Sequence, residues 1–255
     1  MILPALQNHI LPIISGTEMG IPLNLLSFTI QDASHHVSLT AGVIIFNCML
    51  GFSTYKTDRY LDSLEFYTKN TSNTINFSKV DYYNSIIENK KVIELTLFIS
   101  YIWVLGLIIY YKVGIMLPLY TSTFLYKSLK KNSMTSWLKP FYVAFMWSYC
   151  TCILPIQIMH LDLNEFCILP IYLNMFSLTN FQDLKDIDED ISNNIQTLPV
   201  IFGSAMTRNV ILLSAGLSIY YFTQLDNFHW TLPNLLFMTS SLAPLSAILG
   251  NVTSH

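Results

Sequence analysis

Two groups of aspartates at helical spacing are the residues of this chain best suited to chemistry. Asp58 and Asp62 follow an apolar segment at i, i+4. Asp183, Asp186 and Asp190 follow i, i+3, i+7. On an α-helix such residues share a face, where like charges repel unless a cation lies among them. Because Mg²⁺ is usually held by a few carboxylates, waters and substrate phosphate oxygens, the spacing predicts a metal site whose substrate also binds metal.

The composition is that of an integral membrane protein. The 255 residues are 52% hydrophobic and 11% charged, whereas soluble domains carry about 25% charged residues. The net charge of −3 and the lack of a basic tract give no sign of a nucleic-acid partner. Long uncharged runs approach the roughly 17–25 residues of a membrane-spanning helix. About eight spans are predicted, at 2–17 or 10–30, 37–54, 92–111, 113–126, 140–159, 165–181, 208–223 and 232–249.

These spans predict an all-α, polytopic membrane helical bundle formed by a single domain, residues 1–255. Its connections 55–91, 127–139 and 183–208 contain all of the 13 Lys and Arg residues except Lys112. With one crossing per span, the three connections lie on one face, which the positive-inside rule makes cytoplasmic, stromal or matrix. Both aspartate groups lie on this face. Carboxylates for metal and cations for oxyanions thus share one membrane surface, which is the composition of a diphosphate site.

Several of these polar residues have a structural interpretation beside the functional one. Asp58 and Asp62 alone could be a solvated acidic helix end. Lys127, Lys130 and Lys131 could bind phosphate oxygens, but as positive-inside anchors they need no further role. The histidines lie on the predicted opposite face, where they are better explained as interfacial polar residues than as metal or pigment ligands. The four cysteines fall in apolar runs without a CxxC pair and predict small buried side chains.

The second aspartate group lies within a longer motif. Asp183-Leu-Lys-Asp-Ile-Asp-Glu-Asp190, with a Thr-Leu-Pro-Val-Ile-Phe-Gly sequence ending at Gly203, resembles the second aspartate motif of the UbiA-type intramembrane prenyltransferases. That motif is DxxDxxxD followed by a Thr/Ser-Leu-Pro-Val-x-Phe-Gly-like tail. Thr54-Tyr-Lys-Thr-Asp58-Arg-Tyr-Leu-Asp62 resembles the first motif of the family, NxxxDxxxD.

Two further segments agree with the same family. Tyr126-Lys-Ser-Leu-Lys130 fits its YxxxK sequence, and the segment from Lys139 to Trp147 resembles the helix that follows. Order, spacing and predicted sidedness agree from about residue 37 to 225. Lys185 and the Gln-Thr-Leu-Pro-Val sequence lean slightly towards the chlorophyll synthase and homogentisate prenyltransferase side of the superfamily.

The resemblance implies a bundle with a central cavity, capped by motif-bearing loops at 55–91 and 183–207. It implies that a polyprenyl diphosphate binds through two or more Mg²⁺ ions to metal-binding and catalytic aspartates, namely Asp58, Asp62, Asp183, Asp186 and Asp190. Tyr126 would be a catalytic residue near the reactive carbon. Substrate-binding roles fall to Arg59, Lys127, Lys130, Lys185 and Asn180. The isoprenoid tail would lie in an apolar channel open to lipid.

The implied reaction transfers the polyprenyl group to a lipophilic aromatic or tetrapyrrole acceptor within the membrane. Departures from the family pattern support an alternative. Thr54 stands in place of the family's Asn, and Glu189 and Ile191 replace a Gly-Asp-Arg context, which removes a phosphate-binding arginine. The alternative is a non-catalytic UbiA-like subunit that binds isoprenoid, quinone or pigment cofactors and scaffolds a larger membrane-protein complex, for example a photosynthetic one.

The complete aspartate groups favour the enzyme over the scaffold, since a scaffold has no use for costly carboxylates. A transporter fits less well, because no charged residue falls in the middle of a predicted span. Abundant Asn, Lys, Ile and Tyr suggest an AT-rich genome. This composition is consistent with a plastid, thylakoid or other organelle membrane.

Overall fold

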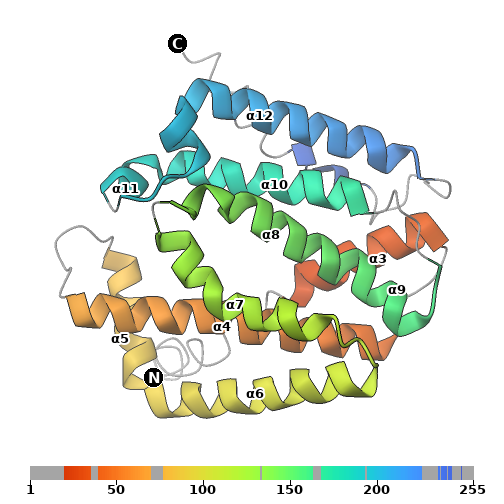
Figure 1. The fold of residues 1–255 in the computed structure, drawn as a ribbon, viewed down its shortest axis with the longest axis horizontal. Helices are drawn as coiled ribbons and strands as arrows, with labels where there is room; N and C mark the ends of the chain where they lie inside the picture. Colours follow the sequence, from red (N-terminus) through yellow and green to blue (C-terminus); the bar gives the residue numbers. More distant parts are fainter. Residues whose placement is uncertain are drawn as a thin grey trace, which may run out of the picture. The chain divides into compact units, whose positions relative to one another are not determined.

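Every regular element in the described part of the chain is a helix (Figure 1). The computed structural model describes residues 20–35, 40–69, 77–132, 134–162, 168–192, 194–225 and a few positions from 235 to 248. Its elements are α3 (Gly20–His35), α4 (Ala41–Lys69), α5 (Phe77–Glu88), α6 (Lys90–Tyr110), α7 (Met116–Lys131), η3 (Ser136–Leu138), α8 (Lys139–Ser148), η4 (Tyr149–Ile153), α9 (Leu154–Met159), α10 (Ile168–Lys185), α11 (Ile187–Ser192) and α12 (Leu198–Thr223). The prediction of an all-α fold is therefore confirmed for these residues.

Three of the described helical segments are long and apolar enough to cross a membrane. They are Lys90–Tyr110, Ser136–Met159 and Leu198–Thr223. These segments are compatible with a membrane protein and overlap three of the predicted spans. The count of eight spans stays a prediction. The expected spans at 2–17 and, for the most part, 232–249 lie outside the described residues.

The described residues divide into two compact units, each described here by itself. The first contains residues 44–127, which hold most of α4 together with α5, α6 and most of α7. Within it, α4 lies against α6 through a hydroxyl contact between Thr57 and Tyr101. One turn further along α4, Tyr60 donates a 2.5 Å hydrogen bond to Glu94. The aspartate-bearing half of α4 is thereby anchored to the neighbouring helix.

The outer surface of α6 is apolar. A single stripe of this helix is buried, formed by Ile93, Leu97, Ser100, Val104 and Ile108. The rest exposes large apolar side chains, such as Phe98 at 61% and Ile109 at 76%. A shallow groove of about 400 Å³ lies on this surface, lined by Ile102, Trp103, Gly106, Leu107 and Tyr110. In water this surface would be unfavourable, whereas in a bilayer it suits contact with lipid.

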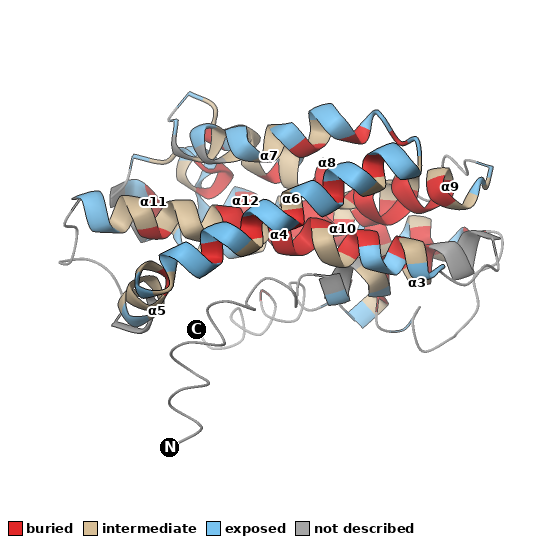
Figure 2. Cartoon of the chain, turned by 90° about the horizontal axis from the view of Figure 1, so that it is seen from below, coloured by how far each residue is buried: buried red, intermediate tan, exposed pale blue. Residues whose placement is uncertain are grey.

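The second unit includes residues 128–255 and centres on α10. Figure 1 shows α8 and α12 running beside α10 on its two sides. Ser177 on α10 donates a 3.3 Å hydrogen bond to the carbonyl oxygen of Ile211, and Ser218 on α12 donates a 2.7 Å bond to that of Pro170. These pairs make α10 and α12 antiparallel. Small hydroxyl residues allow such close helix packing in membrane proteins, and α10 accordingly buries more residues than its neighbours α8 and α12 (Figure 2).

The connections predicted as motif-bearing loops are largely helical. α4 continues through Asp58 and Asp62 to Lys69, because no proline interrupts it where the apolar segment ends. α5 fills much of the remaining 55–91 connection, and α11 and the start of α12 fill much of 183–207. Asp58 and Asp62 therefore lie on regular helix, and the second group lies on helical backbone except at Asp186, which falls between α10 and α11.

Gly203 interrupts α12 within the tail of the second motif. Its φ of 81° and ψ of 161° kink the helix in a conformation that is open almost only to glycine. Apart from its chain neighbours and the adjacent backbone of its own helix, no atom lies within 4 Å of the position a Cβ would take, so any strain on substitution comes from the backbone. Gly216 has the same free space in the regular part of α12.

We expect Gly203→Ala to lower the free energy of unfolding by about 1–3 kcal/mol. Gly216→Ala is the matched control and should leave stability unchanged or raise it by up to about 1 kcal/mol. The measurement is the apparent melting temperature of the purified variants in one detergent. Equal shifts for the two variants would show that the kink places no special demand on residue 203.

Candidate functional site

The second aspartate group lies where α10 ends and α11 begins. α10 ends at Lys185, and Asp186 occupies a bend between the two helices. Backbone hydrogen bonds still cross the bend, from the Asp186 amide to the Gln182 carbonyl at 3.3 Å and from the Asp190 amide to the Asp186 carbonyl at 2.8 Å. The group therefore differs from the expected single helix face. Asp183 and Asp190 are buried while Asp186 is exposed, so the bend leaves one of three repelling charges in solvent.

Asp183 is the most deeply buried carboxylate of this group, with 0% of the residue exposed. Its Oδ1 atom accepts a hydrogen bond from the Lys139 ammonium at the start of α8. Among the described residues, its Oδ2 atom has no hydrogen-bond partner, and neither does Oδ1 of Asn180, one turn earlier on α10. Buried acceptors without a donor are costly. Carboxylate and amide oxygens are also the atoms that ligate hard divalent cations.

Asp190 is held by Thr197, the residue that directly precedes α12. Asp190 is 8% exposed, and its Oδ2 atom accepts a 2.9 Å hydrogen bond from the Thr197 hydroxyl. Thr197 occupies the N-cap position of α12, yet its side chain makes no capping hydrogen bond to that helix. The preceding amide, of Gln196, donates a 2.9 Å bond to the Ser136 hydroxyl. The tail of the motif thus fixes the orientation of the carboxylate.

Burial makes the ionised form of both carboxylates unfavourable. It raises the pKa of Asp190 to about 6; Thr197 and Lys139 oppose this rise, and the charges of Asp183 and Asp186 add to it. Burial also raises the pKa of Asp183, against the opposing effects of Lys139 and Lys130. At neutral pH the cluster therefore gains from any additional cation that reaches it.

We expect the protein without metal to lose stability as the pH rises from about 4 to about 6. The folded pKa of Asp190, about 6, lies above the unfolded value of about 3.9. Between these values the folded state keeps a proton that the unfolded state has released, so the stabilisation is present at low pH and is lost as the pH rises. Apparent melting temperatures in EDTA measure this effect. Asp190→Asn should flatten the curve, whereas an unchanged slope in that variant would contradict the assignment.

The first aspartate group lies in the other unit, on the continuous helix α4. Because α4 is unbroken, Asp58 and Asp62 share one face of it, and both are half-buried. The Arg59 guanidinium lies 5.1 Å from the centre of the Tyr55 ring, which restrains it on the helix surface. Lys56 is fully buried, although no motif or spacing in the sequence indicates a role for it.

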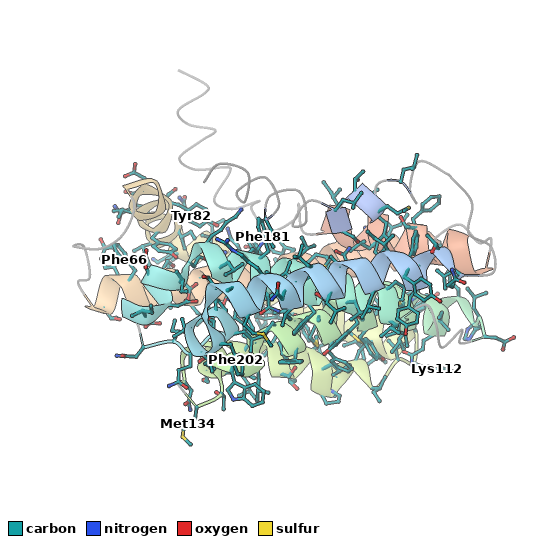
Figure 3. All side chains as sticks on the ribbon, turned by 90° about the horizontal axis from the view of Figure 1, so that it is seen from above. Phe66, Tyr82, Lys112, Met134, Phe181 and Phe202 are labelled. Atoms are coloured by element: carbon teal, nitrogen blue, oxygen red, sulfur yellow. The ribbon has the colours of Figure 1, made fainter. Side chains whose placement is uncertain are left out.

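The remaining predicted residues take several positions. Tyr126 and Lys130 are half-buried on α7, and the side chain of Lys127 lies outside the described part. Lys185 is exposed, with its ammonium 4.5 Å from the centre of the Phe181 ring, which is labelled in Figure 3. Residues two positions apart on an α-helix are rotated by about 200° around its axis. Lys185 and the buried Asp183 therefore lie on different faces of α10. The positive charge of Lys130 acts on Asp183, where it lowers the pKa of the carboxyl.

Two residues of this cluster were not predicted, Lys139 and Thr197. Lys139 stands 44 residues from its partner Asp183, so no local spacing connects them. The sequence does place it directly before Pro140 at the start of an apolar run, which marks a helix N-terminus. Thr197 was recognised only as part of the motif tail. Its bond to Asp190 explains why a hydroxyl residue stands there.

Among the described residues, no group of three or more His, Cys, Asp and Glu side chains is arranged to hold a metal ion. None of the family models, curated proteins or solved structures compared with the chain matches it. Membership of the UbiA superfamily therefore stays a prediction that depends on the motifs.

Proposed function

We propose that this chain is an Mg²⁺-dependent intramembrane prenyltransferase of the UbiA type. Its reaction would transfer a polyprenyl group from a polyprenyl diphosphate to an aromatic or tetrapyrrole acceptor. The observation that carries the proposal is the buried cluster at the end of α10. There, Asp183 Oδ2 and Asn180 Oδ1 are buried acceptors without a donor among the described residues. Such a pair suits a hard divalent cation better than it suits an empty protein interior.

The chemistry of the donor atoms suits Mg²⁺, although the described side chains do not form a group of three metal ligands. Asp183, Asp186 and Asp190 would hold the ion, and the first sequence motif alone predicts Asp58 and Asp62 as further ligands. When bound, Mg²⁺ supplies neutralisation of the charge that develops on the diphosphate leaving group. Thr197 orients one carboxylate through its hydrogen bond. The carboxylate of Asp186 is exposed, whereas Asp183 and Asp190 are buried.

Apolar rings adjoin the cluster within the same unit. Phe176 lies two turns before Asp183 on the buried face of α10. Its ring packs 4.8 Å from that of Phe141 on α8 and 6.4 Å from that of Tyr172. Departure of diphosphate leaves an allylic cation, which water would capture, so a water-poor surround favours transfer to the acceptor. The electron-rich faces of aromatic rings also stabilise positive charge.

The second candidate is a non-catalytic subunit of the same fold that binds an isoprenoid, quinone or pigment. One observation favours it. Lys139 already provides a positive charge on Asp183, and a lysine can take the place of a metal in a site that no longer performs turnover. The departures at Thr54, Glu189 and Ile191 point the same way.

The test uses the full chain purified in detergent. Polyprenyl diphosphates of several lengths are incubated with a panel of aromatic and tetrapyrrole acceptors, in Mg²⁺ or in EDTA. Release of inorganic diphosphate that requires both Mg²⁺ and an acceptor supports the transferase. Tight binding of the isoprenoid without release supports the second candidate. If the chain neither binds the isoprenoid nor releases diphosphate, both candidate functions are overturned.

A further inference from the structure

Lys139 occupies one oxygen of a carboxylate that the proposed function gives to a metal. The ammonium is bonded to Asp183 Oδ1, and the two side chains are 20% and 1% exposed. A metal ion binds a carboxylate oxygen at about 2.0–2.1 Å. An ammonium at hydrogen-bond distance from the same carboxylate would repel that ion strongly in a poorly solvated site. Binding of the metal to Asp183 therefore weakens the ion pair of Asp183 with Lys139, and the ion pair weakens metal binding.

The surroundings of Lys139 allow its ammonium group to move while α8 keeps its position. Lys139 is the first residue of α8, and the ring of Phe141 in the same turn packs 4.8 Å from that of Phe176 on α10. The backbone at the start of α8 is thus held by the core. The lysine stem is flexible and partly exposed, so the ammonium can leave Asp183 by rotation of the side chain alone.

We propose that Lys139 is an internal counterion, which holds Asp183 in the metal-free protein and is displaced from it by the divalent cation. This proposal depends on the proposed function, because it assumes that Asp183 is a metal ligand. The displaced ammonium becomes available to phosphate oxygens. Diphosphate then gives the lysine a new partner, so the anion and the metal bind cooperatively. Lys139 is a positioning residue in this scheme.

The experiment is a titration of the purified chain with Mn²⁺, a spectroscopic substitute for Mg²⁺, with free Mn²⁺ followed by electron paramagnetic resonance. We expect Lys139→Gln to bind Mn²⁺ about tenfold more tightly than the wild type in the absence of diphosphate, which corresponds to about 1.4 kcal/mol. Lys139→Arg keeps the charge and should not bind more tightly. Lys90→Gln is the matched control, because Lys90 begins α6 and lies 3.8 Å from the exposed Glu94, and it should match the wild type. Inorganic pyrophosphate should tighten Mn²⁺ binding more in the wild type than in Lys139→Gln.

The outcomes separate the two proposals. Mn²⁺ binding by the wild type with equal or weaker binding by Lys139→Gln overturns the counterion and leaves the proposed function standing. No Mn²⁺ binding by the wild type overturns the metal site and the counterion together. A second measurement needs only the wild type, in case the variant does not fold. Reductive methylation read by mass spectrometry should label Lys139 more readily when Mn²⁺ is present, with Lys90 unchanged. Unchanged labelling of Lys139 by a protein that binds Mn²⁺ overturns the counterion.

Discussion

Asp186→Asn should reduce Mg²⁺-dependent release of diphosphate by at least about a hundredfold while leaving the fold intact. Removal of one oxyanion-hole donor costs about 2.7–4 kcal/mol in the transition state, and we expect the loss of a ligand to the ion that neutralises the leaving group to have an effect of this order. Asp186 is exposed at the bend between α10 and α11, so the substitution removes a charge without leaving a cavity or an unpaired buried group. The measurement is the initial rate of diphosphate release, together with the apparent melting temperature.

Asp188→Asn is the control for this prediction. Asp188 is also an exposed aspartate of the same acidic run, on α11, but it falls outside the DxxDxxxD pattern. It should retain activity close to that of the wild type. Equal losses in the two variants would indicate that general negative charge at this surface matters, and not a ligand at Asp186. Full activity in Asp186→Asn would remove Asp186 from the metal site.

The helical class and the main apolar segments were predictable because they depend on composition alone. A long uncharged run such as the one in α6 is stable in a bilayer only as a helix, because its backbone groups must hydrogen-bond to one another. Interruptions within helices were harder to predict. The kink at Gly203 and the π-helical turn Tyr149–Ile153 depend on how a helix meets its neighbours, and a hydropathy pattern contains no such information.

The candidate site, too, could be predicted from the sequence only in part. The spacing of Asp183, Asp186 and Asp190 indicated metal chemistry, but it could not show that the helix bends at Asp186. Nor could it show which carboxylates are buried, because burial is set by packing against α8 and α12. The hydrogen-bond partner of Asp183 could not be predicted from the sequence for a related reason. The pair with Lys139 joins residues 44 positions apart, and such a pair follows only from the tertiary fold.

Lys139→Met should lower the free energy of unfolding of the metal-free protein by about 3–5 kcal/mol near neutral pH, because it leaves a buried carboxylate without its counterion. Asp183→Leu should cost less, since the lysine that remains is partly exposed and can turn to water. The double variant should recover much of the loss, because no unpaired charge then remains buried. Apparent melting temperatures in EDTA give the double-mutant cycle.

Lys90 and Glu94 form the reference pair for this cycle. Their side chains are 47% and 48% exposed at a separation of 3.8 Å, and exposed pairs of this kind contribute about 0–1 kcal/mol. Their cycle should show almost no coupling, whereas that of Lys139 and Asp183 should be strongly non-additive. Additive effects at Lys139 and Asp183 would mean that the carboxylate does not depend on the lysine.

The pH dependence of the Lys139→Met variant separates a lost charge pair from lost packing. Burial already raises the folded pKa of Asp183, and removal of Lys139 raises it further above the unfolded value of about 3.9. The folded variant then takes up a proton at mildly acidic pH that the unfolded chain does not hold, so its stability is greater near pH 5 than near pH 7. A packing defect would destabilise the protein equally at both values. The loss of stability of the variant relative to the wild type should therefore be smaller at acidic pH, and Mn²⁺ should reduce it at neutral pH. Both results together would identify Asp183 as a carboxylate that needs a cation, which either the lysine or a metal can supply.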